Sequence, residues 1–468
     1  EEGQEVVPVA TKQRSYQATN TGVIDYRPIT NDHDFFARLQ SVKARRSSPL
    51  ASHPAAFICN FTSNYDKYTI PQLKEMDQLL RNDVFPERGG AAEEGRVEEW
   101  FWEGMASQAE AKILYSSDLE GTAFPEAGPY GEHSWSLQRM ADNERSLLRF
   151  VEYCIPGVNA PMLYFGILFS MFCWHVEDNY MYSVSYLHEG ATKTWYGVSP
   201  KDADAFGEVF NSTFAQAVEK DPELIFRKAA MLPPSQLEAA GIKVCRARQQ
   251  AGQFVVTLPQ AYHAGFSHGF TTAEAVNFML LDWLPYAKLA AKRYRLLSRE
   301  PVIDLEQILV RAAEAGHSPE VRAELALMVK SEITNREGVR RRGCVEVPLD
   351  RAEMSAALGR GPPCSSCGHV CHLSFVERRM EDGSRQDGSR LDERNGRTKT
   401  KPSPPHIVCL RHVADLGADG FSGCRLRTRH PDEFLTALSQ APSTSPRSAT
   451  LPLPATERGG DKKRARSL

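Results

Sequence analysis

Three residues in this sequence have the types and spacing of a metal-binding site. His175 and Glu177 are separated by one residue in Trp174-His175-Val176-Glu177-Asp178, and His263 lies far downstream. Because successive residues of a strand point to opposite faces, a His-x-Glu pair in a strand places both side chains on one face, where a later histidine can join them. Two imidazoles and one carboxylate occupy half of an octahedron, and the open half would admit a 2-oxo acid and dioxygen at Fe(II).

A His-x-Glu pair alone is common, so the interpretation of this pair as a metal site depends on the segments that surround it. The apolar and aromatic run 162–172 reads as a strand, and residues 180–188 and 193–198 read as two more. Lys193 begins the last of these, beside two aromatic residues. A buried cation needs a negative partner, and the distal carboxylate of 2-oxoglutarate would provide one. A salt bridge from Lys193 to a nearby glutamate is the alternative.

Longer motifs around these residues resemble the JmjC domain of histone lysine demethylases. The motifs are Gly157-Val158-Asn159-Ala160-Pro161 and residues 172–178, 186–198 and 262–270. Four flanking segments are similar to the JARID1 branch of that family: 68–76, 114–121, 273–278 and 282–285. The resemblance covers residues 57–430 and implies a mainly β fold with some α, a double-stranded β-helix of the jelly-roll, cupin-like type, followed by an α-helical block and a small zinc-binding module.

The resemblance also implies roles for individual residues. His175, Glu177 and His263 would bind the iron and carry the catalysis. The residues expected to bind or wall the 2-oxoglutarate pocket are Tyr130, Phe172, Ser185, Lys193, Trp195 and Asn277. Those expected to line the methyl-lysine pocket are Gly157, Tyr164 and Ala275. Ser185 departs from the family, which usually has asparagine there, and its single donor and shorter reach predict weaker cosubstrate binding.

The composition fits an enzyme of several parts in a reducing compartment. A chain of 468 residues is expected to hold two or three domains. Its net charge of −3 gives no case for tight nucleic-acid binding, and no stretch resembles a signal peptide or a membrane span. Six of the 10 cysteines crowd between Cys344 and Cys424 at short spacings, which indicates metal binding rather than disulfides.

The cysteine-rich segment predicts a zinc site. It reads Cys364-x2-Cys367-x3-Cys371 and then Cys409-x2-His412-x11-Cys424. Paired knuckles of this kind each give a tetrahedral ion two ligands. These six residues match six of the eight ligand positions of the C5HC2 finger of JARID1-type enzymes, while residues 376–379 and 415–420 lack the other two. Either one of two ions is lost, or a nearby histidine substitutes, the candidates being His369, His372, His406 and His430.

Composition shifts divide the chain into five predicted regions. They are a disordered lead-in at 1–56, the JmjC catalytic domain with its N-terminal extension at 57–285, an α-helical linker domain at 286–360, a C5HC2-like finger with a charged insertion at 361–440, and a disordered basic tail at 441–468. The tail ends with Lys462-Lys463-Arg464-Ala465-Arg466, which is either a solvated end or a nuclear import signal.

The function implied by the resemblance is that of a chromatin-regulating dioxygenase in the nucleus. It would use Fe(II), 2-oxoglutarate, O2 and zinc to demethylate tri- and dimethylated lysine 4 of histone H3, within chromatin complexes and away from membranes. Ala275, the helical block and the finger favour this lysine. The alternatives are a JmjC oxygenase for another histone lysine, a protein hydroxylase, and a non-catalytic chromatin scaffold. Retention of all three iron ligands and of Lys193 argues against the scaffold.

Overall fold

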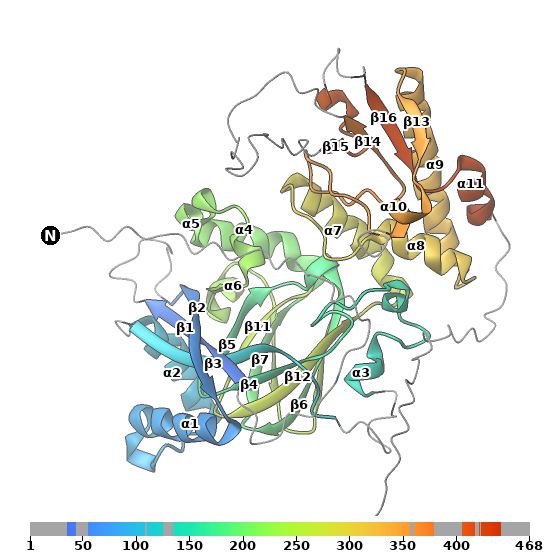
Figure 1. The fold of residues 1–468 in the computed structure, drawn as a ribbon. Helices are drawn as coiled ribbons and strands as arrows, with labels where there is room; N and C mark the ends of the chain where they lie inside the picture. Colours follow the sequence, from blue (N-terminus) through green and yellow to red (C-terminus); the bar gives the residue numbers. More distant parts are fainter. Residues whose placement is uncertain are drawn as a thin grey trace, which may run out of the picture.

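The structure is a computed structural model. It describes residues 35–43, 55–107, 110–124, 133, 135–355, 360–378, 405–416, 421 and 423–440. Most of the predicted lead-in, the tail at 441–468, residues 379–404 of the charged insertion, and Tyr130 lie outside the described residues. Figure 1 shows a β-barrel, with a helical block and a small third sheet packed at one end of it.

Among the described residues, twelve strands build the barrel. They are β1 (Phe35–Lys43), β2 (Phe57–Tyr68), β3 (Glu110–Glu120), β4 (Met162–Gly166), β5 (Met171–His175), β6 (Tyr182–Gly190), β7 (Lys193–Val198), β8 (Ala230–Met231), β9 (Val244–Gln249), β10 (Phe254–Thr257), β11 (Tyr262–Ser267) and β12 (Thr271–Phe278). The larger sheet has the order β10-β6-β12-β4-β3-β1-β2-β8, and the smaller one has the order β5-β11-β7-β9. The two sheets face each other, as in a jelly roll.

The run 162–172, predicted as one strand, is divided between the two sheets. β4 ends at Gly166 in the larger sheet, and β5 begins at Met171 in the smaller one. Between them Phe169 is fully buried and has a φ of 66°, a left-handed conformation that a continuous strand does not contain. Apolar composition predicted burial correctly but does not encode the corner, which tertiary packing imposes.

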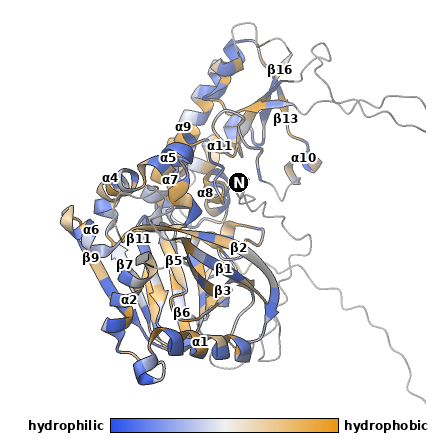
Figure 2. Cartoon of the chain, turned by 90° about the vertical axis from the view of Figure 1, so that its left-hand side faces the viewer, coloured by the Kyte–Doolittle hydropathy of each residue, from blue (hydrophilic) through white to orange (hydrophobic). Residues whose placement is uncertain are grey.

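Two helices from the N-terminal part of the chain pack on the outside of the barrel. α1 (Ile70–Val84) begins at a capping box between Thr69 and Gln72, and α2 (Glu94–Ser107) follows a short loop. Asp77 of α1 accepts a hydrogen bond of 2.7 Å from the Leu168 amide, which ties the helix to the β4–β5 corner. Figure 2 shows polar residues along these helices and apolar residues on the strands beneath. α2 packs on the smaller sheet, where the Phe101 ring stacks on the Phe266 ring of β11 with their centroids 4.0 Å apart.

An α-helical block follows the barrel, as predicted. It contains α7 (Leu284–Leu296), α8 (Leu305–Glu314) and α9 (Pro319–Arg341), and α11 (Asp432–Gln440) from the end of the described chain packs against α8 and α9. The other α-helices of the described residues are α3 (Leu137–Met140), α4 (Ala203–Thr213), α5 (Ala215–Lys220), α6 (Pro234–Ala239) and α10 (Arg351–Ser355). α4 and α5 are separate helices that meet at Phe214.

The third sheet belongs to the cysteine-rich part of the chain. Its order is β13 (Val345–Pro348), β16 (Cys424–Thr428), β14 (Ser374–Arg378) and β15 (His406–Val408). β13 pairs with β16 in parallel, so a segment that the sequence analysis grouped with the helical linker folds with the cysteine-rich module. Conversely, α11 comes from the predicted finger region and packs on the helical block.

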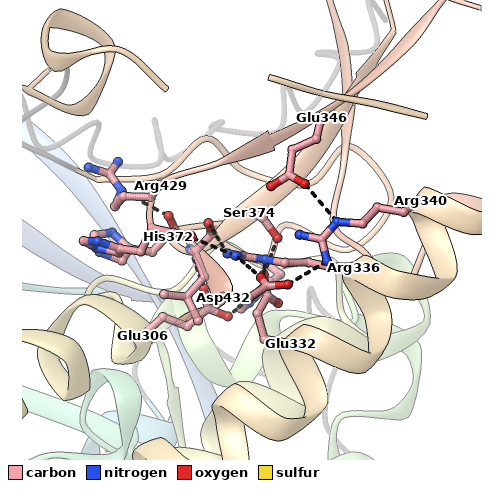
Figure 3. A network of polar contacts seen from close by, with 12 residues as sticks. Glu306, Glu332, Arg336, Arg340, Glu346, His372, Ser374, Arg429 and Asp432 are labelled. Atoms are coloured by element: carbon pink, nitrogen blue, oxygen red, sulfur yellow. Dashed lines mark hydrogen bonds and ion pairs between the residues drawn. The ribbon is translucent and has the colours of Figure 1, made fainter. Parts of the chain in front are cut away.

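A buried arginine joins the helical block to the third sheet. Arg336 of α9 has a side-chain exposure of 0% and donates to Glu332 and Asp432 at 2.9 Å each (Figure 3). It also donates to the Leu373 carbonyl at 2.9 Å and to the His430 carbonyl at 2.8 Å. One guanidinium therefore connects α9, α11 and the loop before β14.

In the part of the chain that the structure describes, no helix combines the length and apolar character needed to cross a bilayer.

Candidate iron, cosubstrate and zinc sites

His175, Glu177 and His263 meet at one point inside the barrel. His175 ends β5 and lies directly opposite His263 of β11 in the strand register. Glu177 follows the end of β5, rather than lying within it as expected, but its backbone is still extended, with φ −64° and ψ 151°. Glu177 Oε1 lies 3.3 Å from His263 Nε2 and 3.7 Å from His175 Nε2. The ligand atoms of all three lie within 4.8 Å of one another.

The histidine rings are oriented for metal binding. His175 Nδ1 lies 2.6 Å from the Cys173 carbonyl, and His263 Nδ1 lies 3.0 Å from the Ala261 carbonyl. Each Nδ1 must carry a proton to donate to these oxygens, which leaves the Nε2 lone pairs directed at the centre. Burial, together with the neighbouring His263, lowers the pKa of His175 to about 4, so this ring is neutral at physiological pH. A neutral imidazole is the form that ligates a metal, and the set fits Fe(II).

The predicted iron ligands share a cavity with the predicted cosubstrate and substrate residues. The cavity measures about 120 Å³, and its lining contains each of those residues that the structure describes: Phe172, Ser185, Lys193, Trp195, Asn277, Gly157, Tyr164 and Ala275. Tyr130 lies outside the described residues. Residues that line the cavity and were not predicted are Tyr115, Ser183, Ala273 and Val276. Tyr115 belongs to β3, far from the histidine motifs, and only its place in the segment 114–121 pointed to the family.

Lys193 is a buried cation in the wall of this cavity. Its residue exposure is 4%, and its Nζ lies 5.6 Å from the centroid of the Phe172 ring. Among the residues that the structure describes, no carboxylate forms an ion pair with it, so the salt-bridge alternative gains no support. Burial lowers the pKa of Lys193 to about 8. An ammonium group in this position is suited to binding an anionic ligand.

The aromatic wall beside Lys193 depends on a glycine that the sequence analysis did not single out. The Phe172 ring packs against Trp195 with their centroids 4.5 Å apart. A Cβ at Gly265 of β11 would overlap this phenyl ring and the Thr194 carbonyl. Glycine is therefore required at this position for Phe172 to lie against β11. A lone glycine within a strand pattern is the sequence signal for such a close approach.

Four of the six predicted zinc ligands come together in the cysteine-rich module. They are Cys364, Cys367, Cys409 and His412, with ligand atoms within 4.8 Å of one another. His412 Nδ1 lies 3.2 Å from Cys409 Sγ and 3.8 Å from Cys364 Sγ, and the Cys367 and Cys409 sulfurs are 4.0 Å apart. Ligands about 2.3 Å from a tetrahedral zinc ion are separated by similar distances. Three thiols and one imidazole fit a structural zinc ion.

The other two predicted zinc ligands, Cys371 and Cys424, lie apart from this group. Cys371 precedes β14, and its thiol donates to the His369 carbonyl at 3.5 Å. Cys424 starts β16 opposite Arg378, which is at the far end of β14. The length of β14 thus separates these two cysteines. No candidate histidine joins them in the described module: for example, His369 Nε2 pairs with Glu306 at 3.0 Å, and His430 stacks on Phe434.

Comparison with known proteins identifies the class to which the barrel belongs. Residues 162–278 match the JmjC domain, described as a hydroxylase. The segment contains β4 to β12 and all three predicted iron ligands. The predicted jelly-roll core is therefore confirmed.

Relatives extend the match beyond the barrel. The chain is 40% identical over 260 residues to lysine-specific demethylase JMJ706 of Oryza sativa subsp. japonica, covering 53% of this chain and 30% of that protein. It is 30% identical over 407 residues to lysine-specific demethylase 5D of Homo sapiens, covering 82% of this chain and 25% of that protein. Lysine-specific demethylase JMJ17 of Arabidopsis thaliana is 34% identical over 313 residues, 61% of this chain and 26% of its own length. Residues 162–278 therefore form a JmjC domain, and the chain is similar to lysine-specific demethylases, of whose own length it spans 25% to 30%.

Proposed function

We propose that this chain is an Fe(II)- and 2-oxoglutarate-dependent histone lysine demethylase that acts on tri- and dimethylated lysine 4 of histone H3. The observation that carries the proposal is the cavity shared by the triad and by the buried ammonium of Lys193. The triad supplies a metal-binding face, and Lys193 supplies a charge for a dicarboxylate that reaches the same metal. A scaffold without catalysis would not require both features in one cavity.

Different residues of the chain would bind the iron and the cosubstrate. His175, Glu177 and His263 would hold the iron, and Lys193, with Tyr130, would bind the distal carboxylate of 2-oxoglutarate. With iron and cosubstrate bound, the site would supply the oxidative chemistry that hydroxylates an N-methyl group, which then leaves as formaldehyde. This chemistry needs no lone pair on the nitrogen, so trimethyl-lysine is accessible.

Other residues that line the cavity would suit a methylated ammonium. The Tyr164 ring packs beside the Tyr115 ring with their centroids 6.3 Å apart, and aromatic faces attract a quaternary cation. Gly157 has a φ of 80°, a conformation that favours glycine, and Ala275 has a side chain of a single methyl group. Small residues beside aromatic rings would leave room for two or three methyl groups.

The zinc site and the setting of the enzyme belong to the same proposal. The proposed structural zinc ion would be held by Cys364, Cys367, Cys409 and His412, in a version of the C5HC2 finger that has fewer zinc ligands. The proposed partners are the methylated tail of histone H3 and chromatin complexes, and the proposed location is the nucleus. The relatives are lysine-specific demethylases by name, and those names do not state a lysine position.

The test is mass spectrometry of a panel of methylated histone peptides incubated with the protein, Fe(II), ascorbate and 2-oxoglutarate. We expect the mass of the trimethyl and dimethyl lysine 4 peptides to fall in steps of about 14 Da. Each step is the net loss of one methylene (one carbon and two hydrogens), because a hydrogen atom replaces each methyl group that is removed. His175→Ala is the matched control, because two remaining ligands cannot retain Fe(II). Turnover of another lysine, or a gain of one oxygen without methyl loss, would select one of the alternative oxygenase functions, and activity in His175→Ala would refute the triad.

A further inference from the structure

We propose that Gln249 is a positioning residue for the 2-oxoglutarate pocket, an inference that rests on the proposed function. Gln249 is the last residue of β9, an edge strand of the smaller sheet, yet it is only 1% exposed. It does not line the cavity itself. A buried amide must find hydrogen-bond partners, and the choice of partners shows which parts of the fold it fixes.

The partners of Gln249 are walls of the cosubstrate pocket. Its Oε1 accepts a hydrogen bond of 2.9 Å from Trp195 Nε1, and its Nε2 donates to the Ser185 carbonyl at 3.1 Å. The same Nε2 donates to the Gln253 carbonyl at 3.0 Å. One amide therefore fixes the Trp195 indole, the β6 backbone at Ser185 and the turn that leads to β10.

The strand register places Gln249 beside the cation of the pocket. Gln249 pairs with Lys193 across β7 and β9, and directly opposite residues of neighbouring strands lie on the same face of a sheet. Ser185 belongs to β6 of the larger sheet, so the hydrogen bond from Gln249 crosses from one sheet to the other. The side chain thus sets the spacing between Lys193, Trp195 and Ser185, the three residues expected to contact one end of 2-oxoglutarate.

Gln249→Leu removes the three hydrogen bonds while keeping a side chain of similar size. The 468-residue chain is loaded with Mn(II) in the absence of oxygen, and binding of 2-oxoglutarate is measured by titration calorimetry. We expect the dissociation constant to rise about tenfold, as for the loss of one well-placed hydrogen bond. Binding of Mn(II) and of the methylated peptide should not change. Gln250→Leu is the matched control, because it is the same substitution at the next, exposed position.

Gln249→Glu tests the same idea if the leucine variant does not fold. Glutamate keeps an acceptor for the Trp195 indole, but it places a carboxylate opposite Lys193, where it competes with the anionic cosubstrate. We expect 2-oxoglutarate to bind at least tenfold more weakly.

Unchanged 2-oxoglutarate binding in the folded variants would overturn the inference. An equal loss of Mn(II), peptide and cosubstrate binding would also overturn it, because that pattern indicates a general structural role. If the unchanged protein itself does not bind 2-oxoglutarate, the proposed function fails instead.

Discussion

Lys193 shows how a single buried residue indicates the charge of the ligand that suits its pocket. Burying an ammonium group costs free energy that a paired anion normally offsets. In the described structure Lys193 faces Phe172 and the cavity, and no carboxylate of the described residues pairs with it. The lowered pKa of about 8 is the direct result of this burial. A dicarboxylate cosubstrate would supply the missing charge.

The first prediction concerns pH. In the free protein Lys193 is charged below its pKa of about 8 and neutral above it. Only the charged form pairs with a carboxylate. The affinity for 2-oxoglutarate should therefore be near its maximum at pH 7 and fall as the pH rises, by about tenfold at pH 9. Titration calorimetry with Mn(II) measures this. Lys193→Met should bind weakly with no such pH dependence, and the same slope in both proteins would exclude Lys193 as the cause.

The second prediction concerns the departure from the family at Ser185. Ser185 lines the cavity on β6, and its side chain offers one donor where asparagine offers two donors and an acceptor. Ser185→Asn should lower the 2-oxoglutarate concentration at half-maximal rate by about tenfold, if a hydrogen bond worth roughly 1.5 kcal/mol is recovered. Ser212→Asn, the same substitution at an exposed serine of α4 that does not line the cavity, is the control. An unchanged or raised half-saturation point for Ser185→Asn would reject the idea.

At the scale of elements, the helical block and the cysteine-rich module are held together by buried charge. Arg336 on α9 is bonded to Glu332 on its own helix and to Asp432 at the start of α11. Arg340, one turn further on, also donates to Asp432 and to Glu346 of β13 (Figure 3). Removal of Arg336 takes away the ion-pair partner of Glu332, while Asp432 keeps its pair with Arg340.

The third prediction is that Arg336→Met destabilises this junction by roughly 3 kcal/mol or more, since breaking a buried ion pair leaves an uncompensated charge. Arg341→Met is the matched control, because Arg341 lies on the same helix and is exposed, and it should change stability by less than about 0.5 kcal/mol. Urea unfolding measures both. Equal midpoints for the two variants would show that the junction does not depend on Arg336.

At the scale of the whole molecule, metal content follows from how the third sheet is built. The strand register keeps Cys371 and Cys424 at opposite ends of β14, while the four residues that gather are provided by the loops around it. The family's two-ion finger is thereby expected to hold one zinc ion in this chain.

The fourth prediction is a zinc content of one ion per iron-free chain, measured by elemental analysis. Cys364→Ser should lose the ion and unfold the module, because structural zinc contributes much of the folding free energy of small modules. Cys371→Ser should retain it, since Cys371 lies outside the four-residue set. A loss of zinc in Cys371→Ser, or two ions in the unchanged protein, would contradict the single site.

The sequence by itself indicated the candidate metal-binding residues, because metal binding restricts residue type. Imidazoles, carboxylates and thiols are the side chains that ligate these metals, and the spacing of His175 and Glu177, together with the resemblance of the surrounding motifs, predicted a shared site with His263. The α-helical block after the barrel was also predictable, since its apolar residues recur at helical spacing. Local signals of this kind depend on neighbours in the chain.

Tertiary structure decided where strands break, which cysteines gather and which distant residues reach the cavity, because these features depend on contacts between distant segments. The corner at Phe169 divides an apolar run that looked continuous, and β14 separates Cys371 from Cys424, the two predicted zinc ligands that lie outside the four-residue group. Tyr115 reaches the cavity from β3, and Gln249 is buried by a sheet-to-sheet contact that no pattern around it reveals. A residue's local sequence sets its chemical capacity, but long-range packing sets which other residues it meets.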